Sequence, residues 1–151
     1  MLLKTHLAIT LFFILLFLPS VNNKIIFVLV AIIATYLPDV DSRHSTIGRR
    51  KLARVLQWFT KHRGMMHSFT FLLSITVVLV FVWPKIALGF FTGYGLHLFA
   101  DSFTKNGIRS FYPSKKVSKG PLKTGSFFET GILVAFVFAD LFLLVIRIGV
   151  L

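Results

Sequence analysis

Five apolar segments divide this chain, and their spacing constrains its fold more than any other feature. They run over residues 7–18, 25–37, 69–83, 86–100 and 132–148. With 56% hydrophobic residues and a mean hydropathy of +0.82, the chain is too apolar for an ordinary soluble fold and is predicted to be a membrane protein. Its 151 residues leave room for one domain, which we take as residues 1–151.

The segments are short for membrane spans. They contain about 12 to 17 residues, whereas roughly 20 are needed to cross a bilayer squarely, so the first two could instead be re-entrant. Flanking residues and local thinning of the bilayer can make up the difference at modest cost. We predict an all-α, polytopic membrane bundle of about five short transmembrane helices.

Most of the formal charge of +12 lies in two long loops. If every segment crosses once, the loops 39–68 and 102–130 lie on the same side, and only Lys24, Lys85 and Arg147 lie near the other. Basic loops stay in the cytoplasm, which predicts an inner (cell) membrane protein of a prokaryote with its N-terminus inside. The basic residues of the two loops are Arg43, Arg49, Arg50, Lys51, Arg54, Lys61, Arg63, Lys105, Arg109, Lys115, Lys116, Lys119 and Lys123.

The two loops differ in pattern. In the first, Leu52, Val55, Leu56 and Phe59 have helical spacing, which predicts a short basic helix in the headgroup layer or packed on the bundle. The second has glycines and prolines that break any period, with aromatic pairs between lysines. Anionic lipid headgroups suit these charges as partners, and nucleic acid is a weaker candidate.

The same crossing count places eight histidines and acids on the face of the two basic loops. A random distribution of eight such residues would not be expected to place all of them on one side. The pattern therefore predicts a metal site there. Because the chain has no cysteine, nitrogen and oxygen must hold any metal. The eight residues are His6, Asp39, Asp41, His62, His67, His97, Asp101 and Glu129.

One stripe of the fourth segment carries part of this site. Gly89, Gly93, His97 and Asp101 recur every four residues, so they share one helix face. The glycines would let a neighbouring backbone approach closely. His97 and Asp101, one turn apart, could reach one cation, although alone such a pair is more often a hydrogen-bonded polar pair at a helix end.

Two loop motifs supply further candidates. Asp39 and Asp41 follow Pro38, where an extended backbone would point both carboxylates the same way; ordinary turn chemistry is the alternative. Between His62 and His67 we favour His67 as the ligand, with His62 and Arg63 binding a phosphate or another anion.

Three other residues stand apart from these motifs. His6 joins the predicted ligands, although a lone histidine there would be read as interfacial. Glu129 could be a ligand, a general base or a favourable charge in the first turn of its helix. Asp140 lies within the fifth segment and is expected to be structural, with a hydroxyl of Tyr94, Ser74 or Thr76 beside it.

These residues together resemble the YdjM-like family of membrane-bound proteins regarded as metal-dependent hydrolases. The resemblance covers residue 4 to about residue 130, and its motifs are His6, Leu37-Pro38-Asp39-Val40-Asp41, His62-Arg63-Gly64-Met65-Met66-His67-Ser68, Gly93-Tyr94-Gly95-Leu96-His97 and Asp101. The family is similar, distantly, to zinc-dependent phospholipases C and single-strand nucleases, which implies hydrolysis of phosphoesters. Those soluble relatives carry a further His-x-x-x-Glu pair, whereas Glu129 has no histidine four positions before it. One or two metal ions are therefore expected rather than three.

The main hypothesis is a hydrolase acting on a phosphoester or other ester of a lipid-like substrate at the cytoplasmic face. The divalent metal would be held by His6, Asp39, Asp41, His67, His97 and Asp101. Histidine and carboxylate donors without thiolate fit zinc, the expected ion, and do not exclude manganese or iron. Glu129, His62 and Arg63 would act in catalysis. A non-catalytic scaffold that binds anionic lipid explains the charge but not the converging ligands. A metal or proton transporter would need more polar residues through the bundle than this chain has.

The topology can be tested by cysteine labelling in a chain that has no cysteine of its own. Single cysteines replacing Ser45 and Ser114 should be labelled from the same, cytoplasmic side, and one replacing Asn22 from the other, because of the charge asymmetry between alternate loops. Labelling of Ser45→Cys and Ser114→Cys from opposite sides would contradict both the topology and the convergent site.

Overall fold

The described part of the chain is entirely helical apart from its connections. In this computed structural model it comprises residues 1–41 and 65–149, without the side chains of Val40 and Asp41. The elements are α1 (Leu3–Phe17), the 3-10 turn η1 (Leu18–Ser20), α2 (Lys24–Tyr36), the 3-10 turn η2 (Leu37–Asp41), α4 (Phe69–Val82), α5 (Pro84–Ser102) and α6 (Phe127–Gly149). Each apolar segment corresponds to a helix, so the predicted all-α class is confirmed. The helix expected between Leu52 and Phe59 lies outside the described residues.

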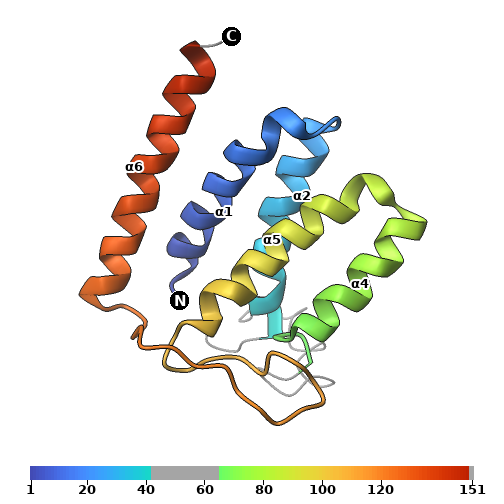
Figure 1. Cartoon of the computed structure of the whole chain (residues 1–151), viewed down its shortest axis with the longest axis vertical. Helices are drawn as coiled ribbons and strands as arrows, with labels where there is room; N and C mark the ends of the chain where they lie inside the picture. The colour runs from blue at the N-terminus through green and yellow to red at the C-terminus, as the bar shows by residue number, and fades with distance from the viewer. Residues whose placement is uncertain (42–64, 150–151) are drawn as a thin grey trace.

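Successive helices run in opposite directions (Figure 1). The starts of α1, α4 and α6 and the ends of α2 and α5 therefore meet at one end of the bundle, and the segment 103–126 passes beneath them. This is the end at which the sequence places the histidines and acids. The alternation expected from the crossing count is present among the described helices.

Among the described residues, two helical stretches are long and apolar enough to cross a membrane, Leu3–Ser20 and α6. α4 is apolar but shorter, with 14 residues. α5 has 19 residues, close to a full span, but polar groups such as His97 and Asp101 lower its hydropathy. For the other three described helices, a membrane crossing thus remains a prediction.

The most extensive helix pair is α2 against α5, and glycines make it possible. A Cβ atom on Gly93 would lie 2.0 Å from the carbonyl oxygen of Ala31, and one on Gly89 would lie 3.0 Å from that of Phe27. The expected close approach of a neighbouring backbone along this stripe is confirmed, and α2 is that neighbour. Buried Phe27, Ala31 and Ile14 of α1 continue the packing there.

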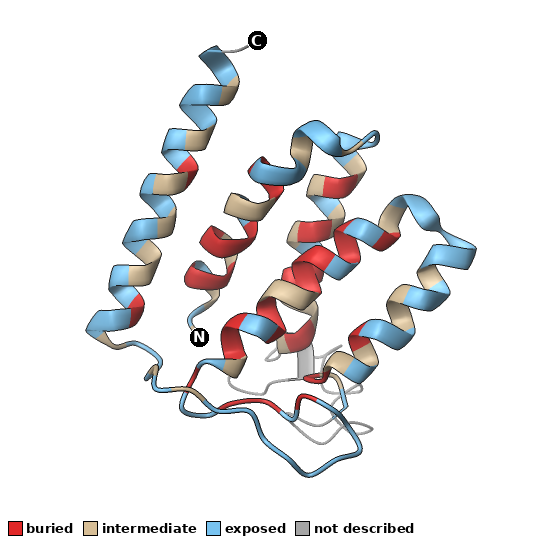
Figure 2. Ribbon diagram, viewed as in Figure 1, coloured by how far each residue is buried: buried red, intermediate tan, exposed pale blue. Residues whose placement is uncertain are grey.

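Helix α6 stands at the edge of the bundle and packs against α1 (Figure 1). Most of its surface is exposed, as the pale blue ribbon in Figure 2 shows, and only Glu129 and Asp140 are buried. A ring contact between Phe12 and Phe136, at 5.5 Å, joins the two helices midway. An apolar helix with so little covered surface is suited to lipid as its solvent.

The segment between α5 and α6 is irregular but tied together. Ile108 and Ser118 exchange two backbone hydrogen bonds of 3.0 and 2.9 Å, and Lys105 N–H donates to the Leu122 carbonyl at 2.7 Å. Gly107 has a φ of +61°, and a Cβ there would meet the Ser118 carbonyl oxygen at 2.2 Å, so only glycine fits. The segment has a fixed shape across the end of the bundle.

Gly93→Ala should destabilise the protein, because its methyl group has no space against α2. We expect a loss of about 1–3 kcal/mol in the free energy of unfolding, as for other overpacked interfaces, measured in detergent by thermal or denaturant unfolding. Gly131→Ala on α6 is the matched control, since a Cβ there meets nothing within 4 Å, and it should be neutral or stabilising. Equal effects of the two substitutions would contradict the packing argument.

Candidate metal centre

Five of the six predicted metal ligands lie together at the end of the bundle. They come from four places in the chain: His6 from α1, Asp39 from η2, His67 from the turn before α4, and His97 and Asp101 from the last turns of α5. They form two overlapping groups, His6–His97–Asp101 and Asp39–His67–His97, in each of which the donor atoms lie within 4.8 Å of one another. His97 belongs to both groups.

The ring of His97 is oriented by helix α2. Its Nδ1 lies 2.8 Å from the carbonyl oxygen of Thr35, and because a carbonyl can only accept, Nδ1 carries the proton. The lone pair of Nε2 therefore points into the cluster. That atom is buried, has no hydrogen-bond partner among the described residues, and lies 3.8 Å from both Asp39 Oδ1 and Asp101 Oδ2. Metal-binding histidines commonly show this pairing of one nitrogen with a carbonyl.

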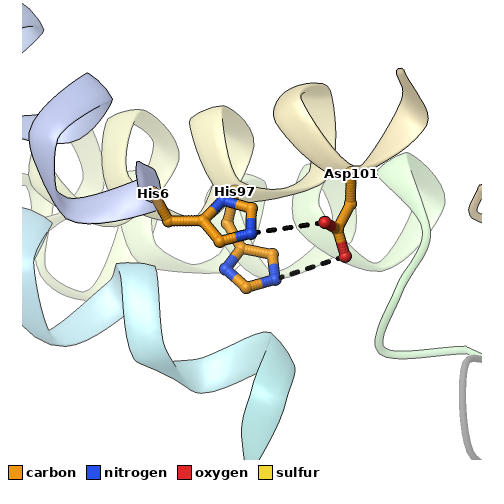
Figure 3. Close-up of side chains that lie close together, drawn as sticks. All are labelled: His6, His97 and Asp101. Atoms are coloured by element: carbon orange, nitrogen blue, oxygen red, sulfur yellow. Dashed lines mark ion pairs between the residues drawn. The ribbon is translucent and has the colours of Figure 1, made fainter. Parts of the chain in front are cut away.

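The ring of His6 lies parallel to that of His97 (Figure 3). The two ring centres are 4.0 Å apart with 7° between their planes, and His6 Nε2 is 3.3 Å from Asp101 Oδ1. Both residues are buried, yet neither ring nitrogen of His6 makes a hydrogen bond within the described part. The α-ammonium of Met1 also pairs with Asp101.

His67 is held by the turn that starts α4. The Ser68 hydroxyl accepts from Phe71 N–H at 3.2 Å, a helix cap that fixes this start, and donates to the Met65 carbonyl. Tyr94 of α5 donates to the Met66 carbonyl at 2.6 Å. The chain on either side of His67 is thus fixed to α4 and α5, and its Nε2 comes within 4.0 Å of Asp39 Oδ1.

Asp39 lies in a 3-10 turn, so the extended backbone expected after Pro38 is wrong. Proline fits the first turn of a helix, because its fixed φ is helical and its missing N–H would be unpaired there. The side chain of Asp39 is 23% exposed, whereas the other four donors are at most 6% exposed. Burial raises the pKa of Asp39 above its ordinary value, and the neighbouring His6 and His67 act in the opposite direction.

The other predicted site residues lie elsewhere. The carboxylate of Glu129 accepts from Leu2 N–H, from Gly125 N–H and from the Thr5 hydroxyl at 3.1 Å, so it joins the starts of α1 and α6 outside the two groups of ligands. This contact fits the third reading of Glu129, a charge in the first turn of its helix, and its catalytic role stays a prediction. His62, Arg63 and the side chain of Asp41 lie outside the described residues.

Asp140 differs in its surroundings from what the sequence suggested. The hydroxyls of Tyr94 and Thr76 donate to the carbonyls of Met66 and Leu72, and α6 packs against α1 rather than α4 or α5. Asp140 Oδ1 is buried without a hydrogen-bond partner among the described residues.

Sequence reasoning missed Thr35, which supports the cluster from behind. Its hydroxyl donates to the Ala31 carbonyl at 2.8 Å and lies 3.0 Å from the Thr10 hydroxyl, joining α1 and α2, while its carbonyl orients His97. The signal available was a hydroxyl residue in an apolar run, one turn before Asp39. A threonine there is also an unremarkable helix residue, so the signal alone did not distinguish it.

The arrangement of donors can hold a metal ion. In a tetrahedral site with ligand bonds of 2.0–2.1 Å, neighbouring donor atoms are about 3.3 Å apart. The distances of 3.3, 3.8, 3.8 and 4.0 Å between carboxylate and imidazole atoms are close to that value. The buried nitrogens of His6 and His97 that make no hydrogen bond within the described residues could supply the lone pairs that such a site requires.

Comparison with known proteins places the chain in a family. The family described as YdjM inner membrane protein matches residues 1–150, and the chain belongs to it. It is similar to the uncharacterized protein YvsG of Bacillus subtilis, 32% identical over 72% of this chain and 71% of that protein. It is also similar to the inner membrane protein YdjM of Escherichia coli, 30% identical over 56% of this chain and 48% of the relative.

The chain thus matches only about half the length of the Escherichia coli protein, and a YdjM of Shigella flexneri shows the same figures. No solved structure matches. The predicted family is confirmed, and the relatives named for the inner membrane agree with the predicted location.

His97→Ala should lose most of its bound metal, because His97 is shared by both groups of ligands. Affinity for zinc should fall at least about tenfold, measured by elemental analysis and by competition with a chelator. Asp140→Asn is the control, which should alter stability but keep the metal. Metal retained in His97→Ala and lost from folded Asp140→Asn would contradict the assignment.

Glu129→Gln should mainly affect stability. Removing the charge weakens three hydrogen bonds, and we expect a loss of about 1–3 kcal/mol in the free energy of unfolding with unchanged metal content. Thr5→Val, which removes one donor to Glu129, should show a smaller loss in the same direction. Unchanged stability with lost activity would instead support the general-base reading.

Proposed function

We propose that this protein is a membrane-bound, metal-dependent hydrolase that cleaves a phosphoester or other ester of a lipid-like substrate at the membrane surface. The observation that carries the proposal is the convergence of three histidines and two aspartates at one end of the bundle. Nitrogens of His6 and His97 are buried without a hydrogen-bond partner among the described residues, which a purely structural role does not explain and a bound cation would. Histidine and carboxylate donors without thiolate fit zinc, our first choice of ion, and do not exclude manganese or iron.

Each residue of the cluster has a part in this proposal. A divalent cation held there would supply a Lewis acid and make water a nucleophile near neutral pH. His97 would bind the cation through Nε2, because the Thr35 carbonyl holds a proton on Nδ1. Asp101 and His6 would close the buried side of the site, with one or two ions shared between the two groups of donors.

Asp39 marks the side from which a substrate would approach. It is the most exposed donor of the five, so an ester group reaching the cluster would meet Asp39 first. His62 and Arg63 remain candidates for holding an anionic group next to the scissile bond. A cytoplasmic location of this end follows from the basic loops and is part of the proposal.

A second candidate is a non-catalytic protein that binds anionic lipid. It is favoured by the segment 103–126, in which six exposed basic side chains occur without any acidic one. This candidate requires the metal to be structural. A transporter is less well supported, because Asp140 is the one buried charged residue of α6 away from the cluster, and the described part offers no series of buried charged residues that would join it to the cluster.

The purified protein should hydrolyse an amphiphilic phosphorylated substrate, faster in anionic vesicles or micelles than in water. A membrane-resident substrate would already be concentrated and oriented at the site. Phospholipids, lipid phosphates and single-stranded nucleic acid would be compared with zinc or manganese. Chelation should abolish turnover.

His67→Ala is the control variant, and its turnover should fall at least about a hundredfold through loss of a ligand. Activity that survives in this variant would indicate a contaminant or another site. Inactivity towards all three substrate classes, with metal bound, would favour the lipid-binding candidate.

A further inference from the structure

An apolar groove lies between α1, α4 and α5, and none of the residues that line it belongs to the metal cluster. It encloses about 490 Å³, within the range of ligand-binding cavities. Six of its lining residues are phenylalanines, and Thr92 carries the one hydroxyl among the lining residues. The phenylalanines are Phe13, Phe17, Phe69, Phe91, Phe99 and Phe111.

The groove and the metal cluster occupy different faces of α5. Thr92, Leu96 and Phe99 line the groove, whereas His97 and Asp101 belong to the cluster. With 3.6 residues per turn, these two sets point roughly 150° apart around the helix axis. A molecule in the groove therefore does not touch the metal ligands of α5, and the groove is a separate site.

The foot of the groove adjoins the basic segment 103–126. Phe111 belongs to both, and its ring centre is 6.3 Å from that of Phe69 at the start of α4. Phe69 N–H donates to the Ser110 carbonyl at 2.8 Å, which fixes the segment against α4 at this point. Arg109 and Lys115, both exposed, lie within four residues of Phe111 along the chain.

We propose that this groove holds a hydrocarbon chain of an anionic phospholipid, whose phosphate lies against the basic segment. An occupant that is apolar along the groove and negatively charged towards the basic segment suits these surroundings, and an anionic lipid has both properties. The surroundings of an inner membrane protein supply it, and juxtamembrane basic residues attract anionic headgroups.

Charge favours a lipid over a helix of another protein as the occupant. The groove lining is apolar apart from Thr92, and the adjoining segment 103–126 carries six exposed basic side chains and no acidic one. An anionic lipid supplies an apolar chain and a negative headgroup in one molecule, whereas an apolar helix supplies only the first.

The proposal can be tested by native mass spectrometry of the detergent-purified chain titrated with phosphatidylglycerol or with phosphatidylcholine of equal chain length. About one phosphatidylglycerol per chain should be retained in preference to phosphatidylcholine. Leu96→Trp, which fills the groove, should weaken retention at least about tenfold, or about 1.4 kcal/mol. Leu88→Trp is the matched control on the same helix, because Leu88 is 50% exposed and does not line the groove.

Charge variants test the other half of the proposal and do not depend on the folding of Leu96→Trp. Arg109→Gln with Lys115→Gln should remove the preference for phosphatidylglycerol, whereas Lys24→Gln with Lys85→Gln, at the opposite end of the bundle, should keep it. His97→Ala should retain the lipid, which separates this site from the proposed hydrolase. Equal retention of both lipids in all variants would overturn the proposal and indicate ordinary annular lipid.

Discussion

At Gly93 the backbone of α5 lies so close to α2 that a methyl group would meet the Ala31 carbonyl oxygen at 2.0 Å, and the candidate site depends on this approach. One turn further along each helix, the same proximity brings the His97 ring under the Thr35 carbonyl at 2.8 Å. A larger residue at position 93 would move the axes apart and lengthen that hydrogen bond. The glycine therefore acts on the chemistry through the orientation of one imidazole.

Burying this cluster of polar side chains without a bound cation costs free energy. An unsatisfied buried polar group costs about 1–3 kcal/mol, and His6 Nδ1 and His97 Nε2 are two such nitrogens within the described residues. Two aspartates beside three histidines offset part of this cost, yet their 3.3–4.0 Å separations leave ion pairs that are long for direct hydrogen bonds. A cation among these atoms would satisfy imidazoles and carboxylates together. This balance explains why polar groups converge in so apolar a chain.

Helix positions and the end at which ligands gather could be predicted from the sequence, because apolar segments fix both the helices and their alternation. The stripe of Gly93, His97 and Asp101 was predictable from its four-residue repeat alone. The conformation after Pro38 was not, since proline suits either an extended chain or the first turn of a helix, and tertiary packing selected the turn. Thr35 was also missed, because it acts through its backbone carbonyl, which every residue has.

Helix α5 separates two chemical environments, with metal-binding donors on one face and a groove lined by phenylalanines on the other. A lipid in that groove would have its ester groups near the foot of the groove, on the opposite side of the helix from His97. In the proposed hydrolase, a substrate would instead approach the cluster from the side of Asp39, the most exposed donor. The basic segment 103–126 lies at the end of α5, and it could attract anionic lipid to the groove or to the metal cluster. In these proposals, lipid retention and hydrolysis are separate properties. A substitution at Leu96 would affect the first, and a substitution at His97 the second.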